Sequence, residues 1–162
     1  MTRGAQILFA VQNDEEELRE ILWAYEMDIS GEIEDHLIIK EDGKVLAGGK
    51  MIEYEHNRYF LAVLGVKQER CDQGLGGALL GEIIRNPGAF CKNPIPELNS
   101  GAASQITTVS RGEAAGFYQK YGFEPCDFAE IPEPYREQCR DCPEKENCKP
   151  VPMRFMIGFG KE

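Results

Sequence analysis

The pattern of apolar and polar residues along the chain predicts a domain in which strands and helices are mixed. Short apolar runs bounded by turn residues predict strands, whereas apolar residues that recur every three or four positions predict helices. The expected strands are residues 7–11, 37–40, 44–54, 59–66, 105–109, 123–126 and 153–159, and the expected helices are residues 13–27, 32–36, 78–85 and 111–121.

Three local signals support this reading. Asn13 followed by Glu16 is typical of the start of a helix. Asp42-Gly43 lies between two expected strands and tolerates the positive φ angles of a tight turn, so it predicts a hairpin. Residues 59–66, YFLAVLGV, are almost continuously apolar, which predicts a central strand covered on both faces.

The stretch that follows this central strand contains three glycines, Gly74, Gly76 and Gly77. Without side chains at these positions, several backbone N–H groups can approach one phosphate-like group. The apolar residues from Ala78 onward predict a helix, so the glycines lie at a helix N-terminus with its partial positive charge. The stretch therefore predicts an anion-binding loop, with a tight turn that binds nothing as the alternative.

Two common phosphate-binding motifs fit this loop poorly. A dinucleotide-binding fingerprint needs a third glycine where this chain has Leu79, and no strand ending in an acidic residue follows at the required distance. A nucleotide P-loop needs a Lys and a Ser or Thr after its last glycine, where this chain has Ala78 and Leu79. Neither class of nucleotide-binding protein is therefore expected.

A third pattern fits better. Residues 73–78, QGLGGA, resemble the loop with which GNAT acyltransferases grip the pyrophosphate of acetyl-CoA, and residues 114–123, AAGFYQKYGF, resemble the helix and turn of the family's other signature. The resemblance extends from about residue 45 to residue 123. It implies an α/β fold of the GNAT type, with a mixed, largely antiparallel sheet of six or seven strands flanked by helices.

The resemblance also implies roles for individual residues. The pantetheine arm of acetyl-CoA would lie beside the strand end at Leu64 and Val66, and Tyr118 would protonate the leaving thiolate as general acid. From spacing alone, Tyr118 also fits an ordinary aromatic helix face whose hydroxyl is satisfied within the fold. The residues whose backbone N–H groups would hold the pyrophosphate are Gln73, Gly74, Leu75, Gly76, Gly77 and Ala78.

The chain departs from the family pattern at two positions. Cys71 stands where an Arg often precedes the loop, which weakens charge pairing with the phosphates but leaves the backbone loop intact. Arg111 stands where an Asn often begins the signature helix. No general base is identified, and the candidates are Glu53, Glu55, His56 and the acidic residues between positions 26 and 35.

The charge of the chain narrows the choice of partner. It has 18 Lys and Arg against 28 Asp and Glu, a net charge of −10, which argues against nucleic acid as a partner. The acidic residues are concentrated between positions 14 and 35, where Arg19 is the only basic residue. This region would attract a positively charged acceptor, with an ordinary solvated helix face as the alternative.

Six cysteines suggest disulfides, but no export signal is evident, so we expect a cytoplasmic chain with reduced thiols. Cys139, Cys142 and Cys148 have a spacing that a metal ion could use, with a fourth ligand from elsewhere. A structural zinc is one hypothesis, an iron–sulfur cluster is a second, and free thiols in a surface loop are the third. No metal is assigned to the active site.

We therefore expect a single domain over residues 1–162, with an irregular insert at residues 86–103 and a segment rich in Pro and Cys at residues 127–152. No apolar run approaches the ~18 residues of a membrane span, so no membrane partner is expected. The expected function is transfer of an acetyl group from acetyl-CoA to the primary amine of a small cationic molecule, by direct attack. The alternatives are acetylation of a protein N-terminus or lysine, and a non-catalytic acyl-CoA-binding or cysteine-based sensor. The oligomeric state is open, with a homodimer among the options.

Overall fold

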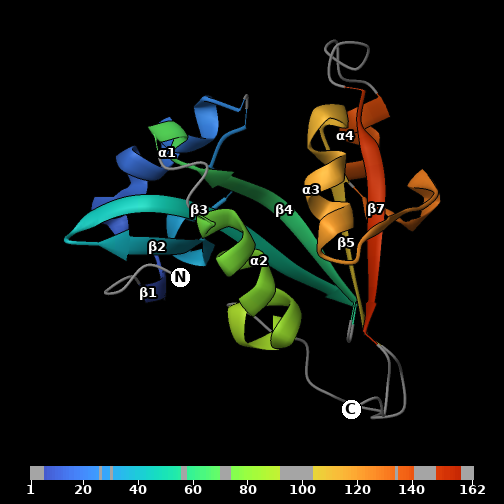
Figure 1. Ribbon diagram of the computed structural model, residues 1–162, viewed down its shortest axis with the longest axis horizontal. Helices are drawn as coiled ribbons and strands as arrows, with labels where there is room; N and C mark the ends of the chain where they lie inside the picture. Colours follow the sequence, from blue (N-terminus) through green and yellow to red (C-terminus); the bar gives the residue numbers. More distant parts are fainter. Residues whose placement is uncertain are drawn as a thin grey trace. The chain divides into compact units, whose positions relative to one another are not determined.

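The computed structural model describes residues 6–25, 27–29, 31–55, 58–69, 74–91, 104–133, 135–140 and 149–157. Within these residues the chain forms a mixed sheet of seven strands in the order β1-β2-β3-β4-β5-β7-β6, with helices beside it (Figure 1). This arrangement confirms the expected α/β class and the expected number of strands. The strands are β1 (Gln6–Phe9), β2 (Leu37–Glu41), β3 (Lys44–Glu55), β4 (Arg58–Val66), β5 (Ser104–Ser110), β6 (Glu124–Pro125) and β7 (Val151–Ile157).

The helical elements are short, and several are single turns of 3-10 helix. The α-helices are α1 (Glu15–Trp23), α2 (Leu75–Arg85), α3 (Ala115–Lys120) and α4 (Tyr135–Arg140). The 3-10 turns are η1 (Gln12–Asp14), η2 (Ile33–Asp35), η4 (Pro87–Phe90), η5 (Gly112–Ala114) and η6 (Phe128–Glu130). The chain divides into two compact units, of which the first comprises residues 1–52 and 62–93 and the second residues 53–61 and 94–162.

The first unit is built on antiparallel strands with α1 packed against them. β1 pairs with β2, and β2 pairs with β3 through a register shift between Ile39 and Lys40. Asp42 and Gly43 join β2 to β3 with φ angles of 53° and 78°, the positive values that a tight hairpin turn requires. The predicted hairpin is thereby confirmed.

The start of α1 depends on Asp14 rather than on the predicted Asn13. The Asp14 carboxylate accepts a hydrogen bond from the Val11 N–H at 2.9 Å and lies 2.7 Å from Nζ of Lys40. Burial raises the pKa of Asp14, but the hydrogen bonds from Lys40 and Val11 outweigh burial, so this pKa lies below its ordinary value. The ion pair between the buried Asp14 and the half-buried Lys40 therefore fixes the turn before α1 to β2. α1 ends at Trp23, four residues before the predicted end at residue 27.

Two glycines allow α1 to lie close to the strands. A Cβ on Gly48 in β3 would clash with the side chain of Leu18 and lie 2.8 Å from the Leu37 carbonyl oxygen. A Cβ on Gly65 in β4 would lie 3.2 Å from Cδ2 of Leu22. The side chains of Leu18 and Leu22 are fully buried, so the absence of side chains on these strands makes room for the apolar face of α1.

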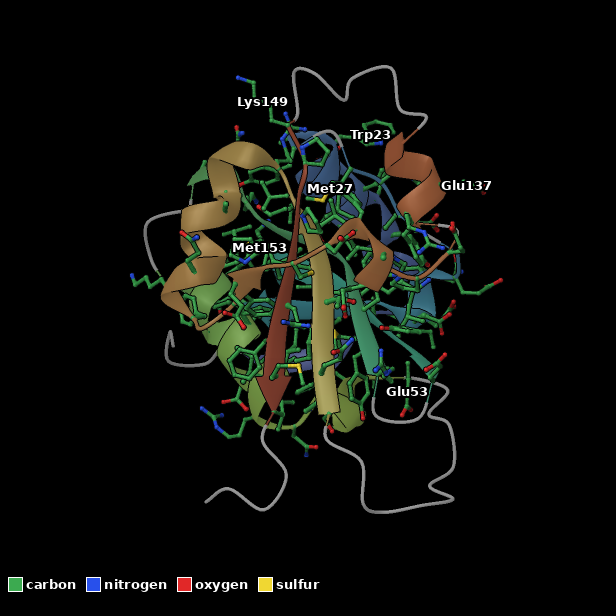
Figure 2. All side chains as sticks on the ribbon, turned by 90° about the vertical axis from the view of Figure 1, so that its right-hand side faces the viewer. Trp23, Met27, Glu53, Glu137, Lys149 and Met153 are labelled. Atoms are coloured by element: carbon green, nitrogen blue, oxygen red, sulfur yellow. The ribbon has the colours of Figure 1, made fainter. Side chains whose placement is uncertain are left out.

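The second unit is organised around β5. Residues of β4 pair with β5 in parallel, in a register that runs from Arg58 opposite Gln105 to Leu61 opposite Thr108. β5 pairs with β7 along its whole length, and β7 pairs with β6, in both cases antiparallel. Figure 2 shows Met153, which is fully buried, on β7 and Glu137 on α4.

Some predicted elements differ from the observed ones. The expected helices at residues 32–36 and 111–121 are a 3-10 turn at Ile33–Asp35 and a 3-10 turn followed by the short α3. α4 was not predicted in the Pro-rich segment, where the ring of its first residue, Tyr135, stacks on Phe60 at 4.4 Å. The insert begins with the 3-10 turn η4, and its residues 92–103 lie outside the described residues.

None of the helices in the described part of the chain combines the length and the apolar character needed to cross a bilayer.

The buried His36 makes the stability of the first unit sensitive to acid. Its side chain is 0% exposed, its Nδ1 lies 2.9 Å from the Glu32 carbonyl oxygen, and burial lowers the pKa of His36 below 6.5. Below pH 6.5 the unfolded chain therefore binds a proton that the folded chain does not, and stability falls with pH. We expect the free energy of unfolding, measured by urea titration between pH 7 and 5, to fall by up to ~1.4 kcal/mol per pH unit, and His36→Asn to remove most of this slope. An unchanged slope in His36→Asn would contradict this assignment.

Candidate active site

The glycine stretch forms the N-terminus of α2, as predicted. Gly74 precedes the helix with a φ of 79°, in the left-handed region that favours glycine. The Ala78 N–H donates to the Gly74 carbonyl at 2.9 Å, so the N–H groups of the residues between them precede the helical hydrogen-bond ladder. The backbone of Leu75, Gly76 and Gly77 therefore offers N–H groups to an anion, while Gln73 lies outside the described residues.

The apolar face of α2 fixes this N-terminus in place. Leu75, Leu79, Leu80 and Ile83 are all 0% exposed, which is the repeat expected of a helix with one buried side. Gly74 is exposed, and a Cβ built on it meets no other atom within 4 Å. The loop is thus open to solvent on one side and anchored to the core on the other.

The end of β4 carries the other predicted donor residues. Leu64 and Val66 are half-buried, and the Lys67 N–H donates to the Leu46 carbonyl in β3 at 2.8 Å. Because the N–H and C=O of one trans peptide point in opposite directions, the Val66 carbonyl points away from β3. The Tyr25 hydroxyl donates to this carbonyl at 2.6 Å, so the segment after α1 is bonded to the strand end.

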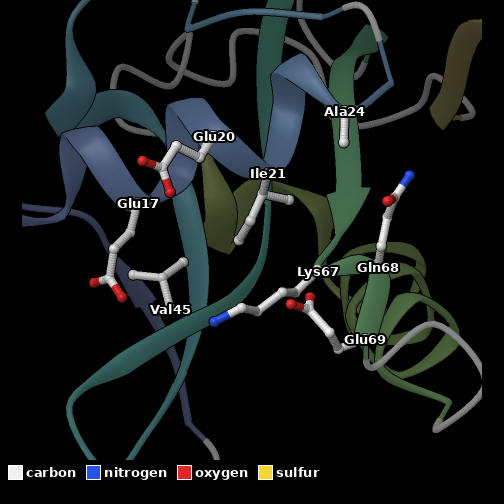
Figure 3. A pocket seen from close by; sticks show the side chains of 8 residues that line it. All are labelled: Glu17, Glu20, Ile21, Ala24, Val45, Lys67, Gln68 and Glu69. Atoms are coloured by element: carbon white, nitrogen blue, oxygen red, sulfur yellow. The ribbon is translucent and has the colours of Figure 1, made fainter.

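A pocket with acidic walls lies beside α1 in the first unit. Its volume is about 250 Å³. Figure 3 shows Glu17 and Glu20 projecting from α1 and Glu69 from the chain after β4. Lys67 supplies the one basic side chain of the lining. The remaining lining residues are Ile21, Ala24, Val45 and Gln68.

Tyr118 lies on α3 in the second unit and is only 8% exposed. Its ring contacts Phe117 and Phe123, with centroid distances of 5.2 and 5.4 Å. Thr108, which is also buried at 3% exposure, is the side chain whose hydrogen bonding acts on the pKa of this phenol. Burial raises the pKa of Tyr118 to about 12, although the bond with Thr108 lowers it in part, so the phenol is protonated throughout the physiological range.

The candidates for the general base lie at separate places along the chain. Glu53 and Glu55 lie at the end of β3, and Glu55 lines a pocket of about 530 Å³ together with Arg58 and Arg136. Arg111 precedes η5, and its carbonyl accepts from the Ala114 N–H at 2.8 Å. His56 lies outside the described residues.

The proposed metal cluster also falls outside the described part of the chain, except for the backbone of Cys139 in α4. Among the described residues, Cys91 and Cys126 are free thiols, and no group of three or more His, Cys, Asp and Glu side chains could hold a metal ion. Burial raises the pKa of the Cys126 thiol, and Glu130 adds to the shift.

The sequence of residues 32–125 matches the family model described as an acetyltransferase (GNAT) domain. This match covers more than half of the chain and includes both the glycine loop and Tyr118. The chain belongs to the GNAT acetyltransferase family. The matched region also includes residues of both compact units. None of the curated proteins matches the chain.

Solved structures of other GNAT acetyltransferases share the fold at low sequence identity. N-acetylglutamate synthase from Neisseria gonorrhoeae, complexed with coenzyme A and N-acetyl-glutamate, superposes with a TM-score of 0.74 and 18% identity over 98% of this chain. This chain spans 36% of that protein's length. A ribosomal-protein alanine N-acetyltransferase from Escherichia coli gives a TM-score of 0.65 and 17% identity, covering 98% of this chain and 97% of its own. Nourseothricin acetyltransferase gives 0.61 and 12%, covering 96% and 99%.

Sequence reasoning missed two side chains that contact predicted site residues in this GNAT chain. Tyr25 lies within the helix expected at residues 13–27, and Thr108 within the strand expected at residues 105–109. Each hydroxyl bonds a β4 carbonyl more than 40 residues away in the sequence. Local periodicity carries no signal for such contacts.

Two tyrosines provide a matched test of the strand end. Tyr25→Phe removes the donor to the Val66 carbonyl, so we expect it to lower the free energy of unfolding by about 1 kcal/mol. The Tyr54 hydroxyl is buried without a hydrogen-bond partner among the described residues, so Tyr54→Phe should be neutral or stabilising. Urea denaturation of both variants checks this, and equal losses from the two substitutions would show that the Tyr25 bond contributes nothing specific.

Proposed function

We propose that this GNAT chain transfers the acetyl group of acetyl-CoA to the primary amine of a small cationic molecule by direct attack. The observation that carries the proposal is the glycine-led N-terminus of α2, which follows the end of β4 in the first unit. The related structure from N. gonorrhoeae contains coenzyme A, which supports acetyl-CoA as the donor here.

The N–H groups of Leu75, Gly76 and Gly77 would receive the pyrophosphate of acetyl-CoA. They lie at the positive end of the helix dipole and before the first helical hydrogen bond. Gln73, Gly74 and Ala78 complete the proposed loop, and Leu64 and Val66 would flank the pantetheine arm. The partial charge of the helix and the bare backbone together compensate for Cys71 at the position where the family often has an Arg.

The reaction needs a neutral amine, a place for the oxyanion and an acid for the thiolate. The amine nitrogen attacks the thioester carbonyl carbon, the C–N bond forms, and the C–S bond then breaks. We assign the protonation of the departing thiolate to Tyr118, whose phenol retains its proton at neutral pH because burial raises its pKa to about 12. The amine loses one proton, so acetyl-CoA and the amine yield an amide and coenzyme A.

The acidic pocket beside α1 supports a cationic acceptor. Glu17, Glu20 and Glu69 face Lys67 alone among the charged residues of its lining, so its potential is negative. Its apolar residues Ile21 and Val45 would accommodate a methylene chain. An acceptor with a second positive charge, beside the amine that reacts, matches this lining.

Donor binding tests the loop directly. We expect micromolar binding of acetyl-CoA by calorimetry, and Gly77→Glu to weaken it at least tenfold, because the new carboxylate lies at the N-terminus of α2 and repels the phosphates. Gly81→Glu adds the same charge to the same helix, at a position where a Cβ meets no other atom within 4 Å, and should bind normally. Failure of the wild type to bind, or equal losses in the two variants, would refute the proposed donor site.

Acceptor selectivity tests the pocket. With a panel of amines, we expect a diamine or polyamine to be acetylated with a lower KM than a monoamine, and Glu17→Gln with Glu20→Gln to raise that KM about fivefold at low salt. Glu16→Gln is the control, because Glu16 is exposed on α1 and absent from the pocket lining. Turnover of peptide N-termini or lysines, with no diamine activity, would favour a protein acceptor instead.

A further inference from the structure

A pocket of about 530 Å³ lies in the second unit, where the end of β3 and the start of β4 meet η6 and α4. We call it the Arg58 pocket, after the arginine at the start of β4 that lines it. None of its lining residues belongs to the proposed donor loop or to the acidic pocket beside α1. Its volume is that of a small-molecule site.

Two of the three glutamates in this lining already face an arginine. The Arg136 guanidinium is paired with the Glu133 carboxylate, with Nε at 2.7 Å and Nη2 at 2.5 Å. Glu130 lies 3.7 Å from Arg154, which belongs to β7. These two carboxylates are therefore compensated by the protein itself, and the charge offered to a ligand depends on the third glutamate and its partner.

That third pair consists of Glu55 and Arg58. Among the described residues the Arg58 guanidinium faces one carboxylate, that of Glu55, and the distance of 3.7 Å is longer than a hydrogen bond. The Glu55 side chain is 69% exposed, and an exposed ion pair of this kind contributes little. The N–H groups of Arg58 are therefore available to a ligand.

The wall of the Arg58 pocket also contains buried donors that lack an acceptor. Within the described residues, the buried side-chain atoms without a hydrogen-bond partner are the Tyr54 hydroxyl, Nε2 of Gln105 and Nε of Arg154. Tyr54 lines the pocket, Gln105 lies opposite Arg58 in the register of β4 and β5, and Arg154 faces Glu130 of the lining. Buried polar groups normally have partners, and all three of these atoms can donate. This side of the second unit is therefore rich in donors and short of acceptors.

An anion whose oxygens only accept hydrogen bonds supplies what this wall lacks. A carboxylate has two such oxygens and matches the fork of an arginine guanidinium. A phosphate dianion fits less well, because the three glutamates of the lining would repel its second charge. Ala129 and Pro132 also line the pocket and offer apolar surface to the carbon chain of a carboxylic acid.

We propose that the Arg58 pocket binds a small monocarboxylate, with the Arg58 guanidinium paired to the carboxylate and the Tyr54 hydroxyl as a second donor. Arg58 exchanges its long contact with the exposed Glu55 for hydrogen bonds to the ligand. Tyr54 is half-buried with its hydroxyl inside, so its side chain turns toward the ligand, and it loses no hydrogen bond to the described residues in doing so. The site is independent of the proposed acetyl transfer, because neither residue has a role in that reaction.

Titration with butyrate, followed by the amide signals in two-dimensional NMR, tests the site with a defined carboxylate. We expect saturable shifts at residues that line the Arg58 pocket, with a Kd of about 1–10 mM for so small a ligand. Arg58→Gln should raise this Kd about fivefold or more, because a charge-assisted hydrogen bond is lost, and Tyr54→Phe should raise it about threefold. Butylamine and inorganic phosphate, at the same ionic strength, should bind more weakly than butyrate.

Arg85 supplies a matched control. It is an exposed arginine on α2 that is paired with one nearby carboxylate, that of Glu82, and it does not line the Arg58 pocket. Arg85→Gln therefore removes the same charge elsewhere and should bind butyrate like the wild type. Urea denaturation of each variant shows that the fold is kept, so a lost interaction with butyrate cannot be ascribed to unfolding.

Several outcomes would overturn the inference. Absence of saturable shifts with butyrate, or binding of butylamine or phosphate at least as tight, would rule out a carboxylate site. An unchanged Kd in Arg58→Gln, or equal losses in Arg58→Gln and Arg85→Gln, would remove the specific role of Arg58. Shifts confined to residues 75–77 and abolished by acetyl-CoA would place butyrate at the donor loop instead. Saturated acetyl-CoA should otherwise leave the butyrate Kd unchanged, which separates this site from the proposed donor site.

Discussion

The polar groups of the site depend on one constraint, the need to satisfy the backbone of the buried strand β4. Its carbonyls at Leu61 and Val66 accept hydrogen bonds from the hydroxyls of Thr108 and Tyr25, at 2.8 and 2.6 Å. Each such hydrogen bond contributes about 0.5–1.5 kcal/mol, so these hydroxyls have a structural reason to be where they are. By bonding to the strand they also fix their own positions. The same bonds that complete β4 therefore place side chains beside the residues proposed to handle the donor and the leaving thiolate.

Close packing is the second requirement, and Gly65 meets it at the end of β4. Gly65 lets Leu22 and Tyr25 approach the end of β4, since a Cβ there would lie 3.2 and 3.3 Å from their side chains. Gly74 serves a different purpose, because its φ of 79° turns the chain into α2 while open space surrounds it. A glycine that admits a neighbour and one that permits a backbone conformation look alike in a sequence. The contacts in the structure distinguish them.

The predicted elements that hold are those whose signals are local. A pattern within a few residues indicates each of them: the Asp42-Gly43 turn, the apolar run of β4 and the glycines before α2. Elements fixed by distant partners were missed or misplaced: α1 starts at an ion pair between Asp14 and Lys40, and α4 rests its Tyr135 on Phe60. The hydrogen bonds of Tyr25 and Thr108 span 41 and 47 residues, so no periodicity could reveal them. The glycine-led start of α2 was therefore predictable from sequence, whereas the environment of Tyr118 was not.

That environment explains why a buried phenol would need a second hydroxyl in order to act as an acid. A phenol whose pKa is about 12 keeps its proton securely, but giving it to a thiolate, whose conjugate acid has a pKa near ~8.5, is uphill by ~1.4 kcal/mol for each unit of difference. Hydrogen bonds to a charged oxygen are roughly twice as strong as those between neutral groups, so a nearby donor lowers this cost only as the phenolate forms. Such a donor must not stand unsatisfied beforehand. The Thr108 hydroxyl, which donates to the Leu61 carbonyl at 2.8 Å, meets the second condition.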